Sequence, residues 1–251
     1  MLNYERNRIY ISEQEQTTLR SFKILIAGSG IGSVIAECAL RLGFENITII
    51  DGDRVELTNL NRQNYIQEDV DHKKVKSIER RLLSINPSAN IKICDQFITP
   101  DNAEAIINGH DVAINALDFT SDIPFRFDAI CQSKNIPVLH PYNIGWAAFV
   151  FLIMPDGNNL SILSKDYKQF EKAIVNFFIG SLNPQQSKTL NWMENALTTY
   201  LNEKKKLPPP QLSVASFLLA GSCTHLLYKL ATRSEIKSFP ECYLVGLDNN
   251  T

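Results

Sequence analysis

The sequence predicts an α/β fold: a Rossmann-like, doubly wound, mostly parallel sheet flanked by helices, with an antiparallel extension toward the C-terminus. Three observations predict it. Short apolar runs alternate with helical stretches as far as residue 140, a glycine-rich loop follows the first apolar run, and the order changes after residue 146. Strands and helices that alternate at this length are typical of a parallel sheet covered on both faces.

Each element follows from its local pattern. Short apolar runs with polar flanks predict strands, and apolar residues at helical spacing predict helices. Gly43 caps one helix and Asn86-Pro87 breaks another. The predicted strands are Lys23–Ala27, Asn46–Ile50, Asn90–Cys94, Asp111–Ala116, Pro137–His140, Trp146–Met154 and Tyr243–Leu247. The predicted helices are a short one within 1–20, then Val34–Leu42, Asp71–Ile85, Asp101–Asn108, Phe125–Lys134, residues 165–206 and Leu212–Arg233.

One domain accounts for all 251 residues, because single α/β domains often reach this size. Within it we expect an N-terminal helix or arm over residues 1–20 and a nucleotide-binding core over 21–155. A helical insert and a proline-rich linker occupy 156–210, and a helix and strand occupy 211–251.

Composition excludes several classes of protein. The formal net charge of −2 argues against nucleic-acid binding or attachment to an anionic membrane through bulk charge. No apolar run reaches the roughly 18–20 residues that span a bilayer, and the N-terminus lacks the apolar segment of a secretory signal. We therefore expect a cytoplasmic protein. None of the five cysteines forms a CxxC pair, so we expect no zinc.

A glycine-rich loop, residues 28–33 (GSGIGS), follows the first strand and opens a helix. Backbone N–H groups there can hold phosphate oxygens, and glycine lets the backbone approach the ligand. Asp51, at the end of the second strand, suits a ribose. These features alone fit an NAD-dependent oxidoreductase as well as an ATP-binding enzyme, and a tight turn without ligand would give the same loop.

The residues after Asp51 distinguish these possibilities. An Asn-Leu-Asn-Arg-Gln run covers 59–63, and an Asp-x-x-x-x-Lys element ends at Lys74. Adenylation needs fixed cations and a metal, because attack of a carboxylate on the α-phosphorus builds negative charge. With the glycine loop and a strand that ends Asn115-Ala116-Leu117-Asp118, the sequence resembles the activating-enzyme family of the ubiquitin-activating enzymes and the bacterial ThiF, MoeB and HesA proteins.

This resemblance implies an adenylyltransferase that uses ATP and Mg²⁺. Arg62, Lys74 and Asp118 are its implied catalytic residues, with Arg62 offsetting charge and Asp118 holding the metal. A homodimer is also implied, in which Arg6 reaches the phosphates of the second subunit; Arg8 is an alternative to it. The residues implied to bind the nucleotide are Gly28, Gly30, Gly32, Asp51, Asp53, Asn59, Arg62, Gln63, Lys74, Leu117 and Asp118.

The sequence also departs from the family pattern. The glycine loop is one residue short, and Phe119 stands where the family commonly has Asn. Residues 132–222 contain no cysteine, so we expect no enzyme thioester. His140 follows a strand, and we expect it to be structural. The apolar side chains of the 165–206 insert either cover the sheet or dock a partner, and we favour the covering role.

The predicted function is activation of a carboxylate on a small protein or peptide partner as an acyl-adenylate. The partner would be a ubiquitin-like or sulfur-carrier C-terminus, or the precursor peptide of a modified-peptide natural product. Two alternatives remain open at this point: a catalytically inactive scaffold subunit of such a system, and an NAD-dependent oxidoreductase.

Overall fold

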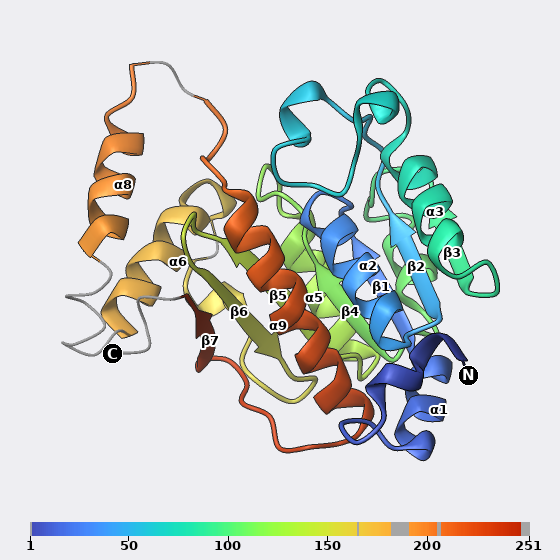
Figure 1. Cartoon of the computed structure of the whole chain (residues 1–251). Coiled ribbons are helices and arrows are strands. Elements are labelled where there is room, and N and C mark those ends of the chain that lie inside the picture. The colour runs from blue at the N-terminus through green and yellow to red at the C-terminus, as the bar shows by residue number, and fades with distance from the viewer. Residues whose placement is uncertain (1, 165, 182–190, 205–206, 247–251) are drawn as a thin grey trace.

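One seven-stranded sheet forms the centre of the computed structural model, which describes residues 2–164, 166–181, 191–204 and 207–246 (Figure 1). The strand order is β3-β2-β1-β4-β5-β6-β7. Strands β1 to β5 are parallel to one another, whereas β6 pairs antiparallel with β5 and β7 pairs antiparallel with β6. The strands are β1 (Lys23–Ala27), β2 (Asn46–Ile50), β3 (Asn90–Cys94), β4 (Val112–Asn115), β5 (Val138–Asn143), β6 (Ala148–Ile153) and β7 (Cys242–Val245).

Helices cover both faces of this sheet, as the doubly wound prediction requires. One apolar core lies between the sheet and α1, α2, α3 and α9, and a second lies between the sheet and α4, α5, α6 and α8. The helices are η1 (Leu2–Asn7), α1 (Glu13–Ser21), α2 (Ile31–Leu42), η2 (Leu57–Asn59), η3 (Gln67–Asp69), α3 (Lys74–Ile85), α4 (Ala103–Ile107), α5 (Ile123–Ser133), η4 (Leu160–Ile162), α6 (Tyr167–Ser181), α8 (Asn191–Leu201) and α9 (Ser213–Ala231).

Strand order reverses between β1 and β4, so the chain leaves the centre of the sheet in opposite directions at these two neighbours. In open α/β sheets, ligands bind outside the carboxyl ends of the strands at such a switch point. The glycine loop follows β1 and Asp118 follows β4, so the topology brings the two predicted motifs to the same edge.

Several element boundaries differ from the sequence prediction. The helix expected from Asp71 begins at Lys74, because Asp71 has a φ of 67° in a turn that precedes it. The helix expected over 101–108 is only Ala103–Ile107. Trp146 lies before β6 and is exposed, whereas the strand itself is buried throughout. Residues 182–190 of the predicted insert helix lie outside the described residues.

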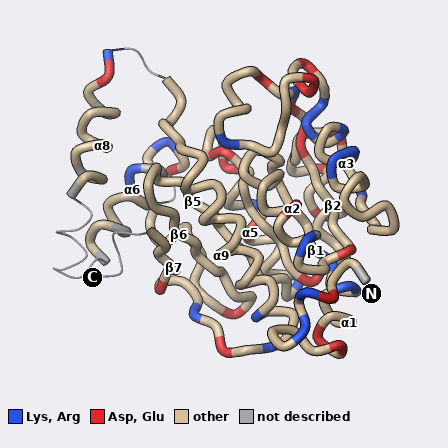
Figure 2. The backbone as a smooth tube through the Cα atoms, in the orientation of Figure 1, with Lys and Arg blue, Asp and Glu red and all other residues tan. Residues whose placement is uncertain are grey.

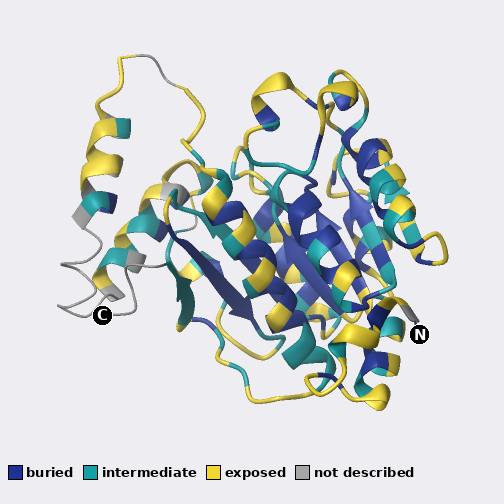
Figure 3. Cartoon of the chain, in the orientation of Figure 1, coloured by how far each residue is buried: buried dark blue, intermediate teal, exposed yellow. Residues whose placement is uncertain are grey.

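Helix α9 corrects the expectation that no segment has the length to cross a membrane. By length and composition alone, Ser213–Ala231 could do so. In the structure it packs between α2 and strands β5 and β6, with Leu219, Cys223 and Leu227 buried. Figure 3 shows buried and exposed positions alternating along it. One face of α9 contacts the sheet and α2 and is buried, which is the packing of a core helix.

The insert helix α6 covers the sheet. Phe170 and Ile174 are buried in the second core, and Phe177 contacts Phe151 and Phe239 there. This confirms the covering role for the side chains that the structure describes.

Candidate active site

The glycine loop and the end of β4 touch at the switch point. Gly28 has a φ of 92°, which residues with a Cβ rarely adopt, and a Cβ there would lie 2.4 Å from the carbonyl oxygen of Ala116. A Cβ on Gly32 would lie 2.5 Å from Ile26 Cγ2. The first glycine therefore brings the two loops together, and Gly32 lets α2 pack closely on β1.

Asp51 fastens the glycine loop to the end of β2. Its Oδ2 accepts hydrogen bonds from the backbone N–H (2.7 Å) and the hydroxyl (2.9 Å) of Ser29, and its Oδ1 accepts from the backbone N–H of Asp53 (2.8 Å). Tyr65 donates its hydroxyl to the Ser29 carbonyl at 2.8 Å from the other side. Since a carboxylate has about four acceptor positions, Asp51 retains capacity for a ligand hydroxyl. It caps no helix.

The Asn-Leu-Asn-Arg-Gln run folds into η2 and the turn that follows it. Asn59 is buried, and its Oδ1 accepts from the backbone N–H of Glu56. Arg62 is half-buried and donates from Nη1 to the Thr58 carbonyl (2.9 Å). Gln63 lies beside Gly30, where an added Cβ would be 3.2 Å from its Nε2. Figure 2 shows both acidic and basic residues along these loops after β2.

Lys74 opens α3 and is buried, with its Nζ 3.2 Å from Asp53 Oδ2. An isolated buried ammonium would be costly, and this ion pair offsets part of that cost. The preceding Lys73 points elsewhere: it pairs with Asp95 at 2.9 Å and donates to the Gly52 carbonyl. Of the two lysines, Lys74 pairs with the predicted site residue Asp53, whereas the Lys73 ammonium pairs with Asp95.

Asp118 completes the arrangement from the β4 side. Its side chain is exposed, yet the surrounding protein removes part of its hydration, and this raises the pKa of the carboxyl above its ordinary value. Lys74 and Arg62 oppose the shift, whereas Asp53 and Asp51 add to it. Partial burial lowers the pKa of Arg62, and Asp118 counteracts this. These five charged residues therefore share one electrostatic environment.

A buried polar network holds the loop that carries Asp118. Asn115 donates to Asp128 Oδ1 (2.8 Å), and His140 Nε2 lies 2.9 Å from the same oxygen. Asn115 Oδ1 in turn accepts from the backbone N–H of Leu117 (3.3 Å). All three side chains of the network are buried, so His140 is structural, as predicted. Because the first helix after Asp118 begins beyond Asp122, Asp118 caps no helix either.

Phe119, the departure from the family pattern, anchors this loop to the insert. Its ring lies 4.2 Å from that of Phe170 on α6 and 5.5 Å from that of Phe125 on α5, centroid to centroid. Offset aromatic pairs at such spacing are favourable beyond the area they bury. The sequence could not predict this contact, because the partner lies 51 positions away in a segment with no pairing signal.

Arg6 lies at the opposite end of the molecule from the glycine loop. In η1, Tyr4 donates to the Leu40 carbonyl and Asn7 donates to the Leu42 carbonyl, both at the C-terminal end of α2 (Figure 1). The glycine loop is at the other end of this helix, about 18 Å away for twelve residues. The structure thus does not bring Arg6 together with the other predicted site residues of its own chain.

Three of the five cysteines lack the setting of an activated nucleophile, whereas Cys38 and Cys94 are partly exposed. Burial raises the pKa of Cys131, Cys223 and Cys242 above that of a free thiol. Such thiols are protonated and inert at neutral pH.

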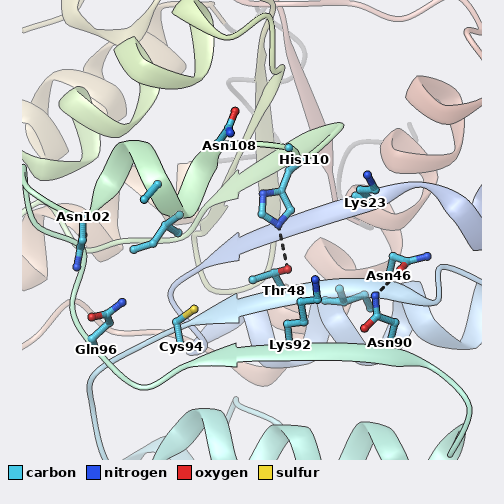
Figure 4. A pocket seen from close by; sticks show the side chains of 14 residues that line it. Lys23, Asn46, Thr48, Asn90, Lys92, Cys94, Gln96, Asn102, Asn108 and His110 are labelled. Atoms are coloured by element: carbon cyan, nitrogen blue, oxygen red, sulfur yellow. Dashed lines mark hydrogen bonds between the residues drawn. The ribbon is translucent and has the colours of Figure 1, made fainter.

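A separate hollow of about 420 Å³ lies over the face of β2 and β3 that the short α4 leaves uncovered (Figure 4). Lys23, Asn46 and Asn90, which begin β1, β2 and β3, line it together with His110, whose Nε2 is 2.9 Å from Thr48 Oγ1. It reaches the amino ends of these strands, away from the switch point, and is distinct from the candidate active site.

Comparison with known proteins now decides the family. The model of the ThiF family matches residues 4–241. The chain belongs to the ThiF family. This match confirms the resemblance that the motifs indicate, and it extends over the insert and α9 as well as the nucleotide-binding core.

Curated ThiF-family relatives are similar to about half of the chain. A tRNA threonylcarbamoyladenosine dehydratase of Escherichia coli (strain K12) is 31% identical over 134 residues, 53% of this chain and 50% of that protein. A sulfur carrier protein ThiS adenylyltransferase of Bacillus subtilis (strain 168) is 29% identical over 158 residues, 61% of this chain and 47% of that protein. The chain thus spans about half the length of the curated relatives that it matches.

Solved structures share the ThiF fold over nearly the whole chain. The crystal structure of E. coli MccB with ATP has a TM-score of 0.69 at 20% identity and covers 93% of this chain and 63% of that one. The crystal structure of PaaA has a TM-score of 0.69 at 22% identity, covering 93% and 72%. These likenesses confirm the predicted α/β fold with its antiparallel C-terminal strands.

Proposed function

We propose that this chain is an ATP-dependent adenylyltransferase that activates a carboxylate of a small protein or peptide partner as an acyl-adenylate. One observation supports the proposal: Asp118, which follows β4 beside the glycine loop, interacts electrostatically with Arg62 and Lys74. A dinucleotide-binding turn needs the glycines and Asp51, but it has no use for this set of opposed charges.

The proposed reaction forms a bond between a carboxylate oxygen and the α-phosphorus of ATP and breaks the bond from that phosphorus to the pyrophosphate leaving group. Negative charge grows on the phosphate oxygens during the step. Arg62 and Lys74 supply fixed positive charge from the stretch after β2, and such preorganised charge lowers the barrier most where water is partly excluded. Asp51 binds the ribose, with Asp53 holding Lys74 in place.

The residues present fit a polyphosphate with Mg²⁺. The Asp118 carboxylate is a hard oxygen donor of the kind that Mg²⁺ prefers. Gly30 is the residue before α2, and with no side chain of its own it lets the Gln63 amide lie beside the start of that helix. Gln63 Oε1 is buried and lacks a hydrogen-bond partner among the described residues, so it is available to the nucleotide. When bound, Mg²⁺ would neutralise phosphate charge, and Asp118 is the residue that would hold it.

Arg6 enters this proposal only through a second copy of the chain. Its own glycine loop is out of reach, whereas the arm that carries it is exposed, with Ile9 and Tyr10 left 95% and 85% accessible. Large apolar side chains that are this exposed to solvent favour contact with another protein surface. We therefore propose a homodimer in which Arg6, or Arg8 beside it, serves the partner's site.

The partner is defined here by the group that it presents, a carboxylate. Because burial raises the pKa of the Cys131, Cys223 and Cys242 thiols, the acyl group would pass from the adenylate to an external nucleophile. A sulfur carrier protein in the name of one relative, and the MccA peptide crystallised with MccB, support a small protein or peptide as the donor of the carboxylate. The proposed use of ATP and the free cysteines also favour a location in the cytoplasm.

Partner-dependent exchange of radiolabelled pyrophosphate into ATP tests the proposal. We expect exchange only when Mg-ATP and a carboxylate partner are both present, tried as a small Gly-Gly-ending protein and as a short precursor peptide encoded beside the chain. Arg62→Ala should reduce the exchange rate about a hundredfold. The matched control is Arg54→Ala, an exposed arginine on the same loop that binds the Asp71 carbonyl and should leave the rate unchanged.

Calorimetric titration with Mg-ATP separates the alternatives. Tight Mg-ATP binding with no exchange for any carboxylate partner would favour the inactive scaffold. Binding of NAD in place of ATP would favour the oxidoreductase and would sink the adenylation proposal.

A further inference from the structure

The linker of residues 207–212 leads into the start of α9 and ends against the candidate active site (Figure 1). Residues 208–210 are three exposed prolines. Their fixed φ angles keep this part of the chain extended and stiff. The next residue, Gln211, is half-buried and points inward.

Hydrogen bonds fix the end of this linker to two loops of the sheet edge. Arg62 Nε donates to Gln211 Oε1 at 2.5 Å, and Asn61 Nδ2 lies 3.3 Å from the Gln211 carbonyl oxygen. Asn143, at the end of β5, donates to the Leu212 carbonyl at 2.8 Å. Gln211 and Arg62 are 149 positions apart, so this contact forms only in the folded chain.

The contact restrains the plane of the Arg62 guanidinium. Its Nε is bound by Gln211, and its Nη1 by the Thr58 carbonyl and by Asn61 Oδ1. A guanidinium presents five N–H donors in one rigid plane, so two fixed nitrogens set the direction of the third. No acceptor for Nη2 occurs among the residues that the structure describes. That edge is left for a ligand.

We propose that Gln211 is a positioning residue for Arg62: its amide oxygen holds the guanidinium so that the Nη2 edge and the full positive charge face the polyphosphate. The inference rests on the proposed function. A neutral acceptor is required here, because a carboxylate in its place would form a charge-assisted pair with Arg62 and compete with the phosphates.

A double-mutant cycle on Mg-ATP affinity tests the inference. Calorimetry gives the dissociation constant for the wild type, Gln211→Ala, Gln211→Glu, Arg62→Ala and the double variant Arg62→Ala with Gln211→Ala. Loss of one oriented hydrogen bond should weaken Mg-ATP binding roughly fivefold in Gln211→Ala. Gln211→Glu should weaken it further. In the Arg62→Ala background, Gln211→Ala should change nothing, because Gln211 acts through Arg62.

Leu207→Ala is the matched control, an exposed side chain at the start of the same linker, and should bind Mg-ATP like the wild type. A fivefold loss that persists without Arg62 would overturn the inference and leave the adenylyltransferase standing. So would a Gln211→Glu variant that binds as tightly as the wild type. A wild-type protein that does not bind Mg-ATP would overturn the proposed function itself, and the inference with it.

Discussion

The two sides of the candidate active site are built differently. The loop side, comprising Asp51, Asp53, Asn59, Arg62 and Lys74, comes from one stretch of 24 residues after β2, and polar contacts within that stretch hold most of it. The strand side carries Asp118 after β4. Buried contacts from distant segments hold it: Asp128 with His140, and Phe119 with Phe170.

The two sides therefore differ in whether the residues that would bind the nucleotide are also the residues that hold the loop in place. On the loop side, the residues that would meet the nucleotide also hold one another, so most substitutions there alter binding and structure together. On the strand side, Asp118 alone faces the site, and its support is an apolar cluster and a buried network that no ligand touches. Activity and stability should therefore be separable on the strand side.

The largest effect should come from Asp118→Asn. Loss of the metal-holding carboxylate should reduce partner-dependent pyrophosphate exchange by a factor on the order of a thousand, with little change in thermal unfolding. The control is Asp122→Asn on the same loop, whose carboxylate is exposed and paired with Arg126. Equal losses for both variants would mean that the loop, and not the Asp118 carboxylate, matters.

Removal of the Phe170 ring, which packs under the Asp118 loop, should lower stability more than it lowers activity. Phe170 is fully buried, and Phe170→Ala would leave a cavity against Phe119 and Phe125. We expect the free energy of unfolding to fall by about 3 kcal/mol in urea titrations. Phe217→Ala, on the exposed face of α9, should cost less than about 0.5 kcal/mol. A Phe170→Ala protein as stable as the wild type would contradict the anchoring of the strand side by α6.

A smaller, opposite effect is expected at Tyr142 on β5. Its hydroxyl is buried and, among the described residues, has no hydrogen-bond partner, while its ring packs on Phe149 and Phe151. Tyr142→Phe keeps the packing and removes the unsatisfied group, so stability should rise by about 1 kcal/mol. Differential scanning calorimetry measures this, and a clear loss of stability would mean that the hydroxyl is hydrogen-bonded in solution.

The smallest effect concerns the pH dependence of stability. Because partial burial raises the pKa of Asp118 in the folded state, its contribution to stability is complete below the pKa of the unfolded chain, about 3.9. That contribution is lost as pH rises through the raised folded pKa. Asp118→Asn should therefore gain thermal stability relative to the wild type as pH rises from 4 to 7. The gain is small, since the side chain is exposed and solvent screens it. A difference that shrinks over this range would contradict the assignment.

The sequence predicted the loop side of the site better than the strand side. Strands β1, β2 and β3 have the predicted bounds, because a short apolar run between polar flanks specifies a buried parallel strand locally. The loop-side residues were predicted together, since they follow one strand and open the next helix. The start of α3 was placed three residues early, because helical periodicity does not reveal the left-handed turn at Asp71.

On the strand side, the sequence marked Phe119 only as a departure, and it gave no sign of Phe170 as its partner or of Gln211 on Arg62. It also left Arg6 with its role open, and the fold places that residue beyond reach of its own site.

By itself, then, the sequence determined the α/β class, the order of its elements, the family and the residues that end β1, β2 and β4, because each of these depends on patterns within a few residues. Only the tertiary structure decided which side chains face one another across that edge: Phe119 on Phe170, Gln211 on Arg62, and Arg6 at the far end of α2. Contacts between residues 35 to 149 positions apart depend on how layers pack, and packing leaves no local signal in the chain.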